Sequence, residues 1–306
     1  MTVADSSPTI AELRAGDEVA GGVYAVTRKD RLTARTGAPY LALELRDRSG
    51  TLPARVFRAP DVLASRFERG DLLRVSGRVE RFRDELALEL VGVERVEPGS
   101  EPGASPERFL PVAYRDLDEL EGFLEHLARE VVARDMRELL ESLLGDHDLR
   151  AGWRRAPCTR AGHHAYLGGL LEHTVAVGTL VLELAPLHPR LDRDLLLCAA
   201  LVHDLGRTRE YTYGAEIGLT HDGRLLGHIQ LGVGLLEERM APLRIEPGRR
   251  TALLHCVLAH HGADGLPGRR FGSAEALALY RINALDAGVK GALEHGLDPA
   301  GRPPSR

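Results

Sequence analysis

Apolar and polar residues alternate in the first third of the chain, a period of two that is typical of half-buried strands. The alternation runs through GGVYAVTRKDRLT, PYLALELRDRSGTLPARVF and DLLRVSGRVERFRDELALELVGVERVE, and Asp-Arg-Ser-Gly at residues 47–50 predicts a turn within it. Five short strands, with a helical piece near residues 62–67, predict a five-stranded Greek-key barrel of the OB-fold type.

The spacing of apolar residues changes to three or four after a Pro-, Gly- and Ser-rich stretch, EPGSEPGASPE, at residues 97–107. DLDELEGFLEHLAREV and RDMRELLESLLGDH have this helical spacing. Longer helices are predicted near residues 167–185, 193–205, 224–241, 248–261 and 273–293. We therefore expect a multi-domain α and β protein with an N-terminal extension (1–15), the barrel (16–97), a linker (98–107), a helical connector (108–160), an all-α domain (161–296) and a C-terminal tail (297–306).

Composition restricts the class of protein further. The chain has 306 residues, enough for about two domains. Its net charge is −5, and the barrel segment carries 15 Lys and Arg against 14 Asp and Glu, so the chain is not a polycation. We see no signal peptide, no apolar run near the roughly 18 residues of a membrane span, and no CxxC motif among three scattered cysteines. A cytoplasmic location without a membrane partner is expected.

Aromatic and basic residues are interleaved along the predicted strands, as in barrels that hold single-stranded nucleic acid. The candidates for such a face are Tyr40, Arg46, Arg55, Phe57, Arg78, Arg81 and Phe82. The same residues also fit a solvated strand face with aromatics in the core, and the sequence leaves both readings open.

Histidines recur on successive predicted helices of the second domain. They are His173, the His203–Asp204 doublet, His228 and the His260–His261 pair, followed by Asn283 and Asp286 on the last helix. Burying so many polar rings without a shared partner is costly, and imidazole with carboxylate is a ligand set for divalent metals. Adjacent residues do not share a helix face, so His203 and Asp204 both ligate only if their helix ends there, with Gly206 letting the chain leave.

This ordered series of residues resembles the HD-domain phosphohydrolases. Over nearly the whole chain, HHAYLGGLLEHT, LVHDLGRTREY, GRLLGHIQLG, LAHHG and the barrel motif GAPYLALELRDRSG resemble the YhaM-type 3′–5′ exoribonucleases, which join an OB-fold to an HD domain. The resemblance implies hydrolysis of single-stranded RNA or DNA from a 3′ end. It also implies one or two divalent ions, with Mn²⁺ favoured over Mg²⁺, Fe²⁺, Co²⁺ or Ni²⁺, and it allows a homo-oligomer.

From the resemblance we assign His173, His203, Asp204 and position 283 or 286 to one metal. His228, His260 and His261 are assigned to a second metal, with Asp204 bridging. Arg207 stands where the family has lysine and is expected to neutralise a phosphate, while His164, next to His163, is expected to contact phosphate or donate a proton.

Two arguments disagree about which residue of the last predicted helix is a metal ligand. The family register points to Asn283, where the family has aspartate, and helical periodicity points to Asp286; we prefer Asn283. Two other functions stay open: a nucleotide or cyclic-dinucleotide phosphohydrolase, and a non-catalytic nucleic-acid-binding regulator with a degenerate HD site, which Asn283 suggests.

Overall fold

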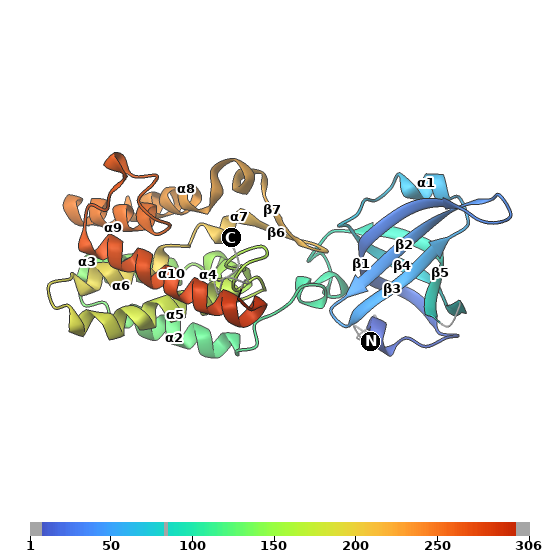
Figure 1. Ribbon diagram of the computed structural model, residues 1–306, viewed down its shortest axis with the longest axis horizontal. Helices are drawn as coiled ribbons and strands as arrows, with labels where there is room; N and C mark the ends of the chain where they lie inside the picture. The colour runs from blue at the N-terminus through green and yellow to red at the C-terminus, as the bar shows by residue number, and fades with distance from the viewer. Residues whose placement is uncertain (1–7, 83–84, 298–306) are drawn as a thin grey trace. The chain divides into compact units, whose positions relative to one another are not determined.

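The computed structural model describes residues 8–82 and 85–297. It divides into two compact units (Figure 1). Unit 1 comprises Met1–Pro111 with Thr212–Gly218, and unit 2 comprises Val112–Tyr211 with Leu219–Arg306.

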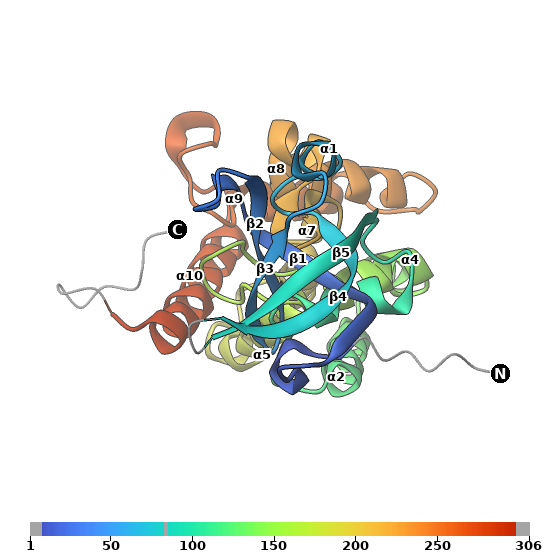
Figure 2. The same cartoon turned by 90° about the vertical axis from the view of Figure 1, so that its right-hand side faces the viewer.

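Unit 1 is a closed barrel in which the strand order is β1-β2-β3-β5-β4 (Figure 2). The strands are β1 (Glu18–Thr33), β2 (Pro39–Asp47), β3 (Gly50–Val56), β4 (Leu72–Phe82) and β5 (Glu85–Val96), with the short helix α1 (Pro60–Ala64) between β3 and β4. Leu41, Leu43 and Leu45 of β2 are buried, and the residues between them face outward. Strict alternation therefore fixes which face of β2 lines the core, and the predicted OB-fold barrel is confirmed.

Unit 2 is helical. Its helices are α2 (Leu117–Arg129), α3 (Arg134–Leu144), α4 (His147–Arg155), α5 (Gly169–Leu184), α6 (Arg193–Val202), α7 (Arg207–Glu210), α8 (His221–Met240), α9 (Pro247–Ala259) and α10 (Ala274–His295). Helices α5 and α6 lie at the centre, and residues 195–202 of α6 are all buried. The sequence of this helix is continuously apolar rather than amphipathic, because neighbouring elements cover the helix on every side.

One helix corrects the expectation that no segment is apolar enough for a membrane span. Gly169–Leu187 passes that test by length and composition, although Glu172 and His173 interrupt it, because its leucines and valines raise the mean hydropathy. Half of the tested window is buried inside the protein. This is the central helix that carries His173, and its apolar character is that of a core helix.

Two segments differ from the pattern-based expectation. Residues predicted as a linker are packed in unit 1, where Ala104 joins a small apolar cluster with Val23, Leu72 and Phe109. A hairpin that the sequence pattern missed, β6 (Tyr211–Tyr213) and β7 (Ile217–Leu219), follows α7, and its residue Ala215 enters the same cluster. The strands of this hairpin have three residues each, which is too short for an alternation of apolar and polar residues to be recognised in the sequence.

Candidate metal centre and nucleic-acid face

The His203–Asp204 doublet lies where α6 stops. Helix α6 ends at Val202, and His203 is its C-cap residue, so both side chains of the doublet turn inward, as the sequence required. Gly206 serves a different purpose from the one expected: its backbone is right-handed helical, but a Cβ atom there would lie 1.9 Å from the His228 carbonyl oxygen. Glycine at this position therefore allows α7 and α8 to approach closely.

The first group of candidate ligands, which we call the His173 group, consists of His173, His203 and Asp204, all buried. His203 Nδ1 lies 2.8 Å from the Ala200 carbonyl oxygen, and His173 Nδ1 lies 2.6 Å from Asp286 Oδ2. When each Nδ1 donates its proton to that oxygen, the two Nε2 atoms face each other as lone pairs at 3.2 Å. A cation between two such nitrogens stabilises the arrangement.

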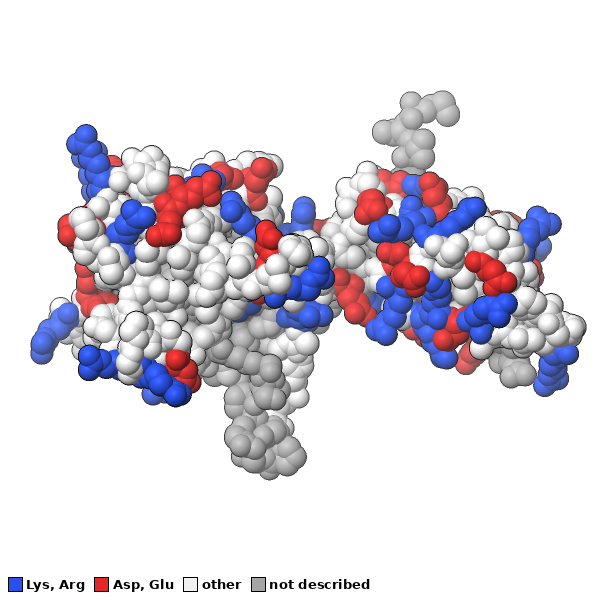
Figure 3. Space-filling view, turned by 90° about the horizontal axis from the view of Figure 1, so that it is seen from above, with Lys and Arg blue, Asp and Glu red and all other residues white. Residues whose placement is uncertain are grey.

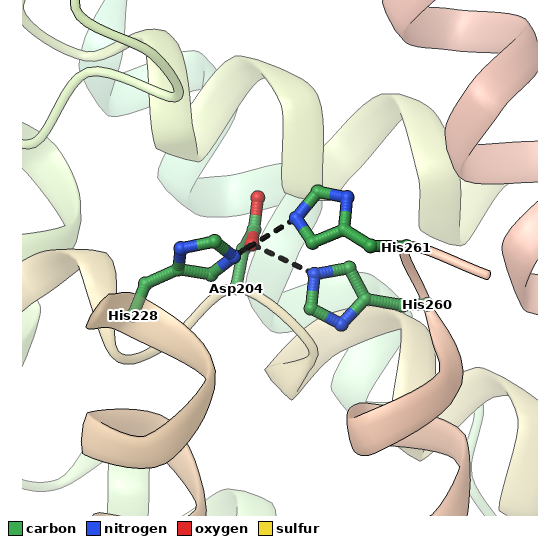
Figure 4. A group of neighbouring side chains, drawn as sticks. All are labelled: Asp204, His228, His260 and His261. Carbon is green, nitrogen blue, oxygen red and sulfur yellow. Dashed lines mark hydrogen bonds and ion pairs between the residues drawn. The ribbon is translucent and has the colours of Figure 1, made fainter. Parts of the chain in front are cut away.

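The second group, which we call the His228 group, consists of Asp204, His228, His260 and His261 (Figure 4). Helices α8 and α9 bring the histidines to the Asp204 carboxylate, whose Oδ1 lies 3.3 Å from Nε2 of His228 and of His260. His228 begins a new helical segment after Gly227, whose φ of 71° kinks α8. Asp204 thus belongs to both groups.

Unpartnered atoms test whether these residues fit a metal ion. Among the described residues, Asp204 Oδ1 and His260 Nε2 are buried and form no hydrogen bond. The 3.3 Å between them is no hydrogen bond either, because His260 Nδ1 is the nitrogen placed to donate, at 2.5 Å from the Val257 carbonyl oxygen. Two acceptors that face each other in a dry site are unfavourable unless a cation lies between them, so the donor set fits a divalent ion.

Burial sets the protonation of this site. It lowers the pKa of His203 to about 3 and also lowers the pKa of His260, because the charged imidazolium loses its hydration. Burial opposes ionisation of Asp204 as well, but the Arg207 guanidinium and the surrounding imidazoles hold the pKa of this carboxyl well below its usual range. At neutral pH His203 and His260 are therefore neutral and Asp204 is a carboxylate, the forms that bind metals.

Arg207 is placed differently from the sequence expectation. It is buried, and its Nε lies 2.8 Å from Asp204 Oδ2 while its Nη1 donates to the Tyr211 hydroxyl at 2.9 Å. Glu210, which the sequence analysis did not single out, lies 3.4 Å from Arg207 Nη1 and accepts a hydrogen bond from the His228 amide. Arg207 thus holds the metal-facing carboxylate in place, and no phosphate reaches it in this arrangement.

His164 and Asp286 act together beside His173. His164 Nε2 lies 3.1 Å from Asp286 Oδ2, and its Nδ1 lies 2.9 Å from the Tyr166 hydroxyl. His164 is 1% exposed and both its ring nitrogens are engaged, so in this arrangement it supports Asp286 and has no opening to a phosphate. Burial opposes ionisation of Asp286, but its hydrogen bonds with His164 and His173 lower the pKa of this carboxyl.

Asn283 and Asp286 occupy different parts of the site. The Asn283 side chain is buried and donates through Nδ2 to the His260 carbonyl oxygen at 3.0 Å. Asp286 is the one that joins the donor groups, through His173. The geometry therefore gives Asp286 the role of orienting His173 and Asn283 that of fixing the end of α9, contrary to our preference for Asn283 as the residue nearest the metal.

Three of the predicted nucleic-acid residues lie together on the barrel. Tyr40 and Phe57 have ring centroids 5.4 Å apart, and Phe57 is 47% exposed. Tyr40 and Arg55 line a cleft of about 270 Å³ on strands β1, β2 and β3. Aromatic faces beside a cation match what a single strand requires.

The other four nucleic-acid candidates are placed as follows. Arg78 and Arg81 are exposed on β4, and Arg55 and Arg78 both have Glu89 of β5 as their register partner. Arg46 is half-buried and donates to the Ala215 carbonyl of the β6–β7 hairpin, so it is committed to an internal contact. The side chain of Phe82 lies outside the described part of the chain. Basic and acidic residues are interspersed on the barrel surface in Figure 3, as its near-neutral charge requires.

Cys158, like Glu210, lies at the site although the sequence pattern did not indicate it, and the position of its neighbour His163 was also not predicted. Its Sγ lies 3.4 Å from His163 Nε2 and 3.6 Å from Asp204 Oδ2. Burial raises the pKa of this thiol well above its usual value and lowers that of His163 to about 3. No spacing motif reveals a single cysteine that a loop brings to histidines elsewhere in the chain.

Comparison with known proteins agrees with this architecture. Residues 170–288 match the HD domain, and residues 19–94 match the OB-fold nucleic acid binding domain. These matches define a protein that combines an OB-fold with an HD domain, and the His and Asp clusters of the HD domain suggest a divalent metal.

Proteins of similar sequence indicate a more specific class of protein. The 3′–5′ exoribonuclease YhaM of Bacillus subtilis is 28% identical over 260 residues, covering 83% of this chain and 80% of its own length. Its counterpart from Halalkalibacterium halodurans is 28% identical, with 86% and 82% covered, and that from Listeria innocua is 26% identical, with 84% and 81% covered. The chain is thus similar over most of its length to the YhaM-type 3′–5′ exoribonucleases, as its motifs predicted.

Proposed function

We propose that the protein is a metal-dependent 3′–5′ exoribonuclease that hydrolyses phosphodiester bonds of single-stranded RNA. The observation that carries the proposal is the buried Asp204 carboxylate, shared by two histidine groups and left with an unpartnered oxygen. The barrel beside it in the sequence supplies an aromatic and cationic face of the kind that holds a single strand.

The chain's own residues hold and orient the donors. The carbonyl oxygens of Ala200 and Val257 accept from Nδ1 of His203 and His260 and so aim each Nε2 into the site. Asp286 does the same for His173, while Arg207 fixes Asp204. Such outer hydrogen bonds select the tautomer and raise ligand basicity. A divalent ion bound there supplies Lewis-acid stabilisation of the phosphate and lowers the pKa of a coordinated water.

Several parts of the proposal go beyond the class of enzyme. The family resemblance favours Mn²⁺ as the ion, which imidazole with carboxylate can bind, and we propose one ion for the His173 group and one for the His228 group. A cytoplasmic location and a homo-oligomer stay predictions. The alternative of a non-catalytic regulator was suggested by Asn283, which stands where the family has aspartate. His173, His203 and Asp204 form a candidate ligand group without Asn283, so this residue no longer supports that alternative.

Product analysis tests the proposal. Single-stranded RNA labelled at its 5′ end is incubated with chelator-treated protein, with and without added Mn²⁺, beside the same sequence as DNA and a cyclic dinucleotide. We expect Mn²⁺-dependent ladders that shorten from the 3′ end, with the cyclic dinucleotide intact. Cleavage of the cyclic dinucleotide with RNA left intact would favour the phosphohydrolase alternative.

A further inference from the structure

A buried thiol lies at the edge of the His173 group, outside the residues of the HD pattern. Cys158, His163 and His173 form a donor group of their own, each with one ligand atom within 4.8 Å of the others. Since His173 also belongs with His203 and Asp204, the two groups join at His173. Cys158 Sγ also lies 3.6 Å from Asp204 Oδ2, which joins them a second time.

We propose that Cys158 and His163 are ligands of the ion held by His173, His203 and Asp204, and that the thiolate makes this position selective for a borderline-soft ion of the Zn²⁺ type. The inference rests on the proposed metal centre and replaces Mn²⁺ for this position only. Sulfur ligands favour Zn²⁺ and Cd²⁺ over Mn²⁺ and Mg²⁺, whereas the His228 group offers only imidazole and carboxylate.

Distances between the donor atoms support a shared ion. For Zn–S of about 2.3 Å and Zn–N of about 2.0–2.1 Å, the angles of about 90–120° between neighbouring ligands of a five-coordinate ion put sulfur and nitrogen about 3.1–3.8 Å apart and two nitrogens about 2.9–3.6 Å apart. Cys158 Sγ lies 3.4 Å from His163 Nε2, and His173 Nε2 lies 3.2 Å from His203 Nε2. Each pair is therefore spaced as two ligands of one ion are, and the two pairs are linked by the 3.6 Å from Cys158 Sγ to Asp204 Oδ2 and by the 4.8 Å limit that joins Cys158 and His163 to His173.

The loop around Cys158 holds the thiol in position. The Cys158 amide donates to the His164 carbonyl at 3.0 Å, and the Tyr211 hydroxyl donates to the Cys158 carbonyl at 3.5 Å. Thr159 Oγ1 donates to the His163 carbonyl at 2.7 Å and accepts from the Gly162 amide at 2.9 Å, which closes the turn between the two proposed ligands. Cys158 and His163 are 1% and 8% exposed, so the site is dry and preorganised.

Charge also favours a thiolate here. Asp204 is the one carboxylate of the His173 group, and Asn283 on the facing helix is neutral. A divalent ion held by His173, His203 and Asp204 has only one carboxylate among its ligands, and that carboxylate also pairs with the Arg207 guanidinium. When the thiol binds, its S–H bond breaks, the S–metal bond forms and the proton leaves to solvent, so the ligand set gains one negative charge without any change of oxidation state.

Co²⁺ binding to the chelator-treated full-length protein is the test, because a thiolate ligand gives Co²⁺ a near-ultraviolet charge-transfer band that imidazole and carboxylate do not give. The control is the double variant Cys198→Ala/Cys256→Ala, which keeps Cys158 and removes two buried core thiols outside the donor groups. We expect the band in the wild type and in this control, and its loss in Cys158→Ala.

Affinity and proton release provide a second measurement, which does not depend on the spectrum. We expect Cys158→Ala and His163→Gln to weaken Zn²⁺ binding about tenfold or more, with Mn²⁺ binding changed much less. Zn²⁺ should release one proton fewer per ion from Cys158→Ala than from the wild type.

The outcomes separate this inference from the proposed function. Visible Co²⁺ bands without the charge-transfer band in the wild type, or a band that persists in Cys158→Ala, would overturn the thiolate ligand and leave the metal centre standing. No binding of Co²⁺, Zn²⁺ or Mn²⁺ to the wild type would overturn both.

Discussion

The metal centre is defined by which nitrogen of each imidazole faces inward. His203 and His260 are fixed by carbonyl oxygens of their own helices, three residues back, so a helix end is enough to aim them. His173 lies in the middle of α5, where carbonyls are used by the helix, and depends on Asp286 of α10 instead. The side chain that orients a ligand is therefore as important here as the ligand.

Substitution of Asp286 tests that dependence. We expect Asp286→Ala to weaken metal binding by about 10–100-fold, because His173 loses the acceptor that fixes its tautomer. Asn283→Ala should instead destabilise the protein by about 1–3 kcal/mol, since it removes the donor to a buried carbonyl, and should leave metal affinity nearly unchanged. Calorimetric metal titration and urea unfolding of both variants measure the two effects, and metal loss in Asn283→Ala alone would reverse the assignment.

Acidification should destabilise the metal-free protein. The pKa of His203 falls from 6.5 to about 3 on burial, so below pH 6.5 the unfolded chain takes up a proton that the folded chain does not. The lowered pKa of Asp204 acts in the same direction at lower pH, where the carboxylate is lost. Thermal unfolding should therefore show a Tm that drops as pH falls from about 6.5 towards 3. His203→Gln should make this fall of Tm with pH smaller. The control variant His188→Gln, at an exposed histidine, should leave the fall of Tm unchanged. An equal fall of Tm in the two variants would contradict this explanation.

At the scale of elements, the arrangement depends on close contact between α7 and α8. Gly206→Ala places a methyl group against the His228 backbone, and we expect it to cost about 1–3 kcal/mol of stability and to weaken metal binding at the His228 group. Gly122 lies in α2 with nothing within 4 Å of its Cβ position, so Gly122→Ala should be neutral or stabilising. Urea unfolding measures the stability of both variants, and equal stabilities would show that the close contact between α7 and α8 does not contribute to stability.

Sequence pattern predicted the helices that carry His173, His228 and the His260–His261 pair because each is long enough for its spacing to repeat. It also gave the condition under which both residues of the doublet ligate, that their helix ends there; the helix predicted over 193–205 ends at Val202. It did not predict the contacts of Glu210 with His228 or of Cys158 with Asp204, because these join segments that are distant in the sequence. Arg207 contacts Asp204 only three residues away, but the resemblance directed Arg207 to a phosphate instead. Nor did the sequence pattern find that Arg46 is committed to the hairpin.

Substitution of Arg46 tests whether this residue stabilises the protein through its contact with the β6–β7 hairpin. Arg46→Ala should lower the stability of the protein by about 1–3 kcal/mol, because a half-buried carbonyl contact is lost. Arg55→Ala, beside Tyr40 at the barrel cleft, should instead weaken RNA binding. Thermal unfolding and RNA binding measured on both variants separate the two roles, and the opposite pattern would return Arg46 to the nucleic-acid face.

At the scale of the whole molecule, strand holding and hydrolysis are assigned to separate units. A double variant, Tyr40→Ala/Phe57→Ala, should lose about 1–3 kcal/mol of RNA binding for each stacked base. Hydrolysis of long RNA should slow accordingly, while that of a dinucleotide, which needs no barrel, should be unchanged. Equal loss on the two substrates, measured as kcat/KM, would place the barrel in the active site.

The central claim is that the buried Asp204 carboxylate holds the ion that makes the protein a 3′–5′ exoribonuclease. Asp204→Asn tests it most directly, because it keeps the size of the side chain and removes its charge. Bound metal and Mn²⁺-dependent shortening of 5′-labelled RNA are measured on the wild type and this variant, with RNA affinity as the control for an intact barrel. The account predicts that Asp204→Asn loses both metal and hydrolysis and keeps its RNA affinity. Wild-type rates of 3′-end shortening in Asp204→Asn would contradict it.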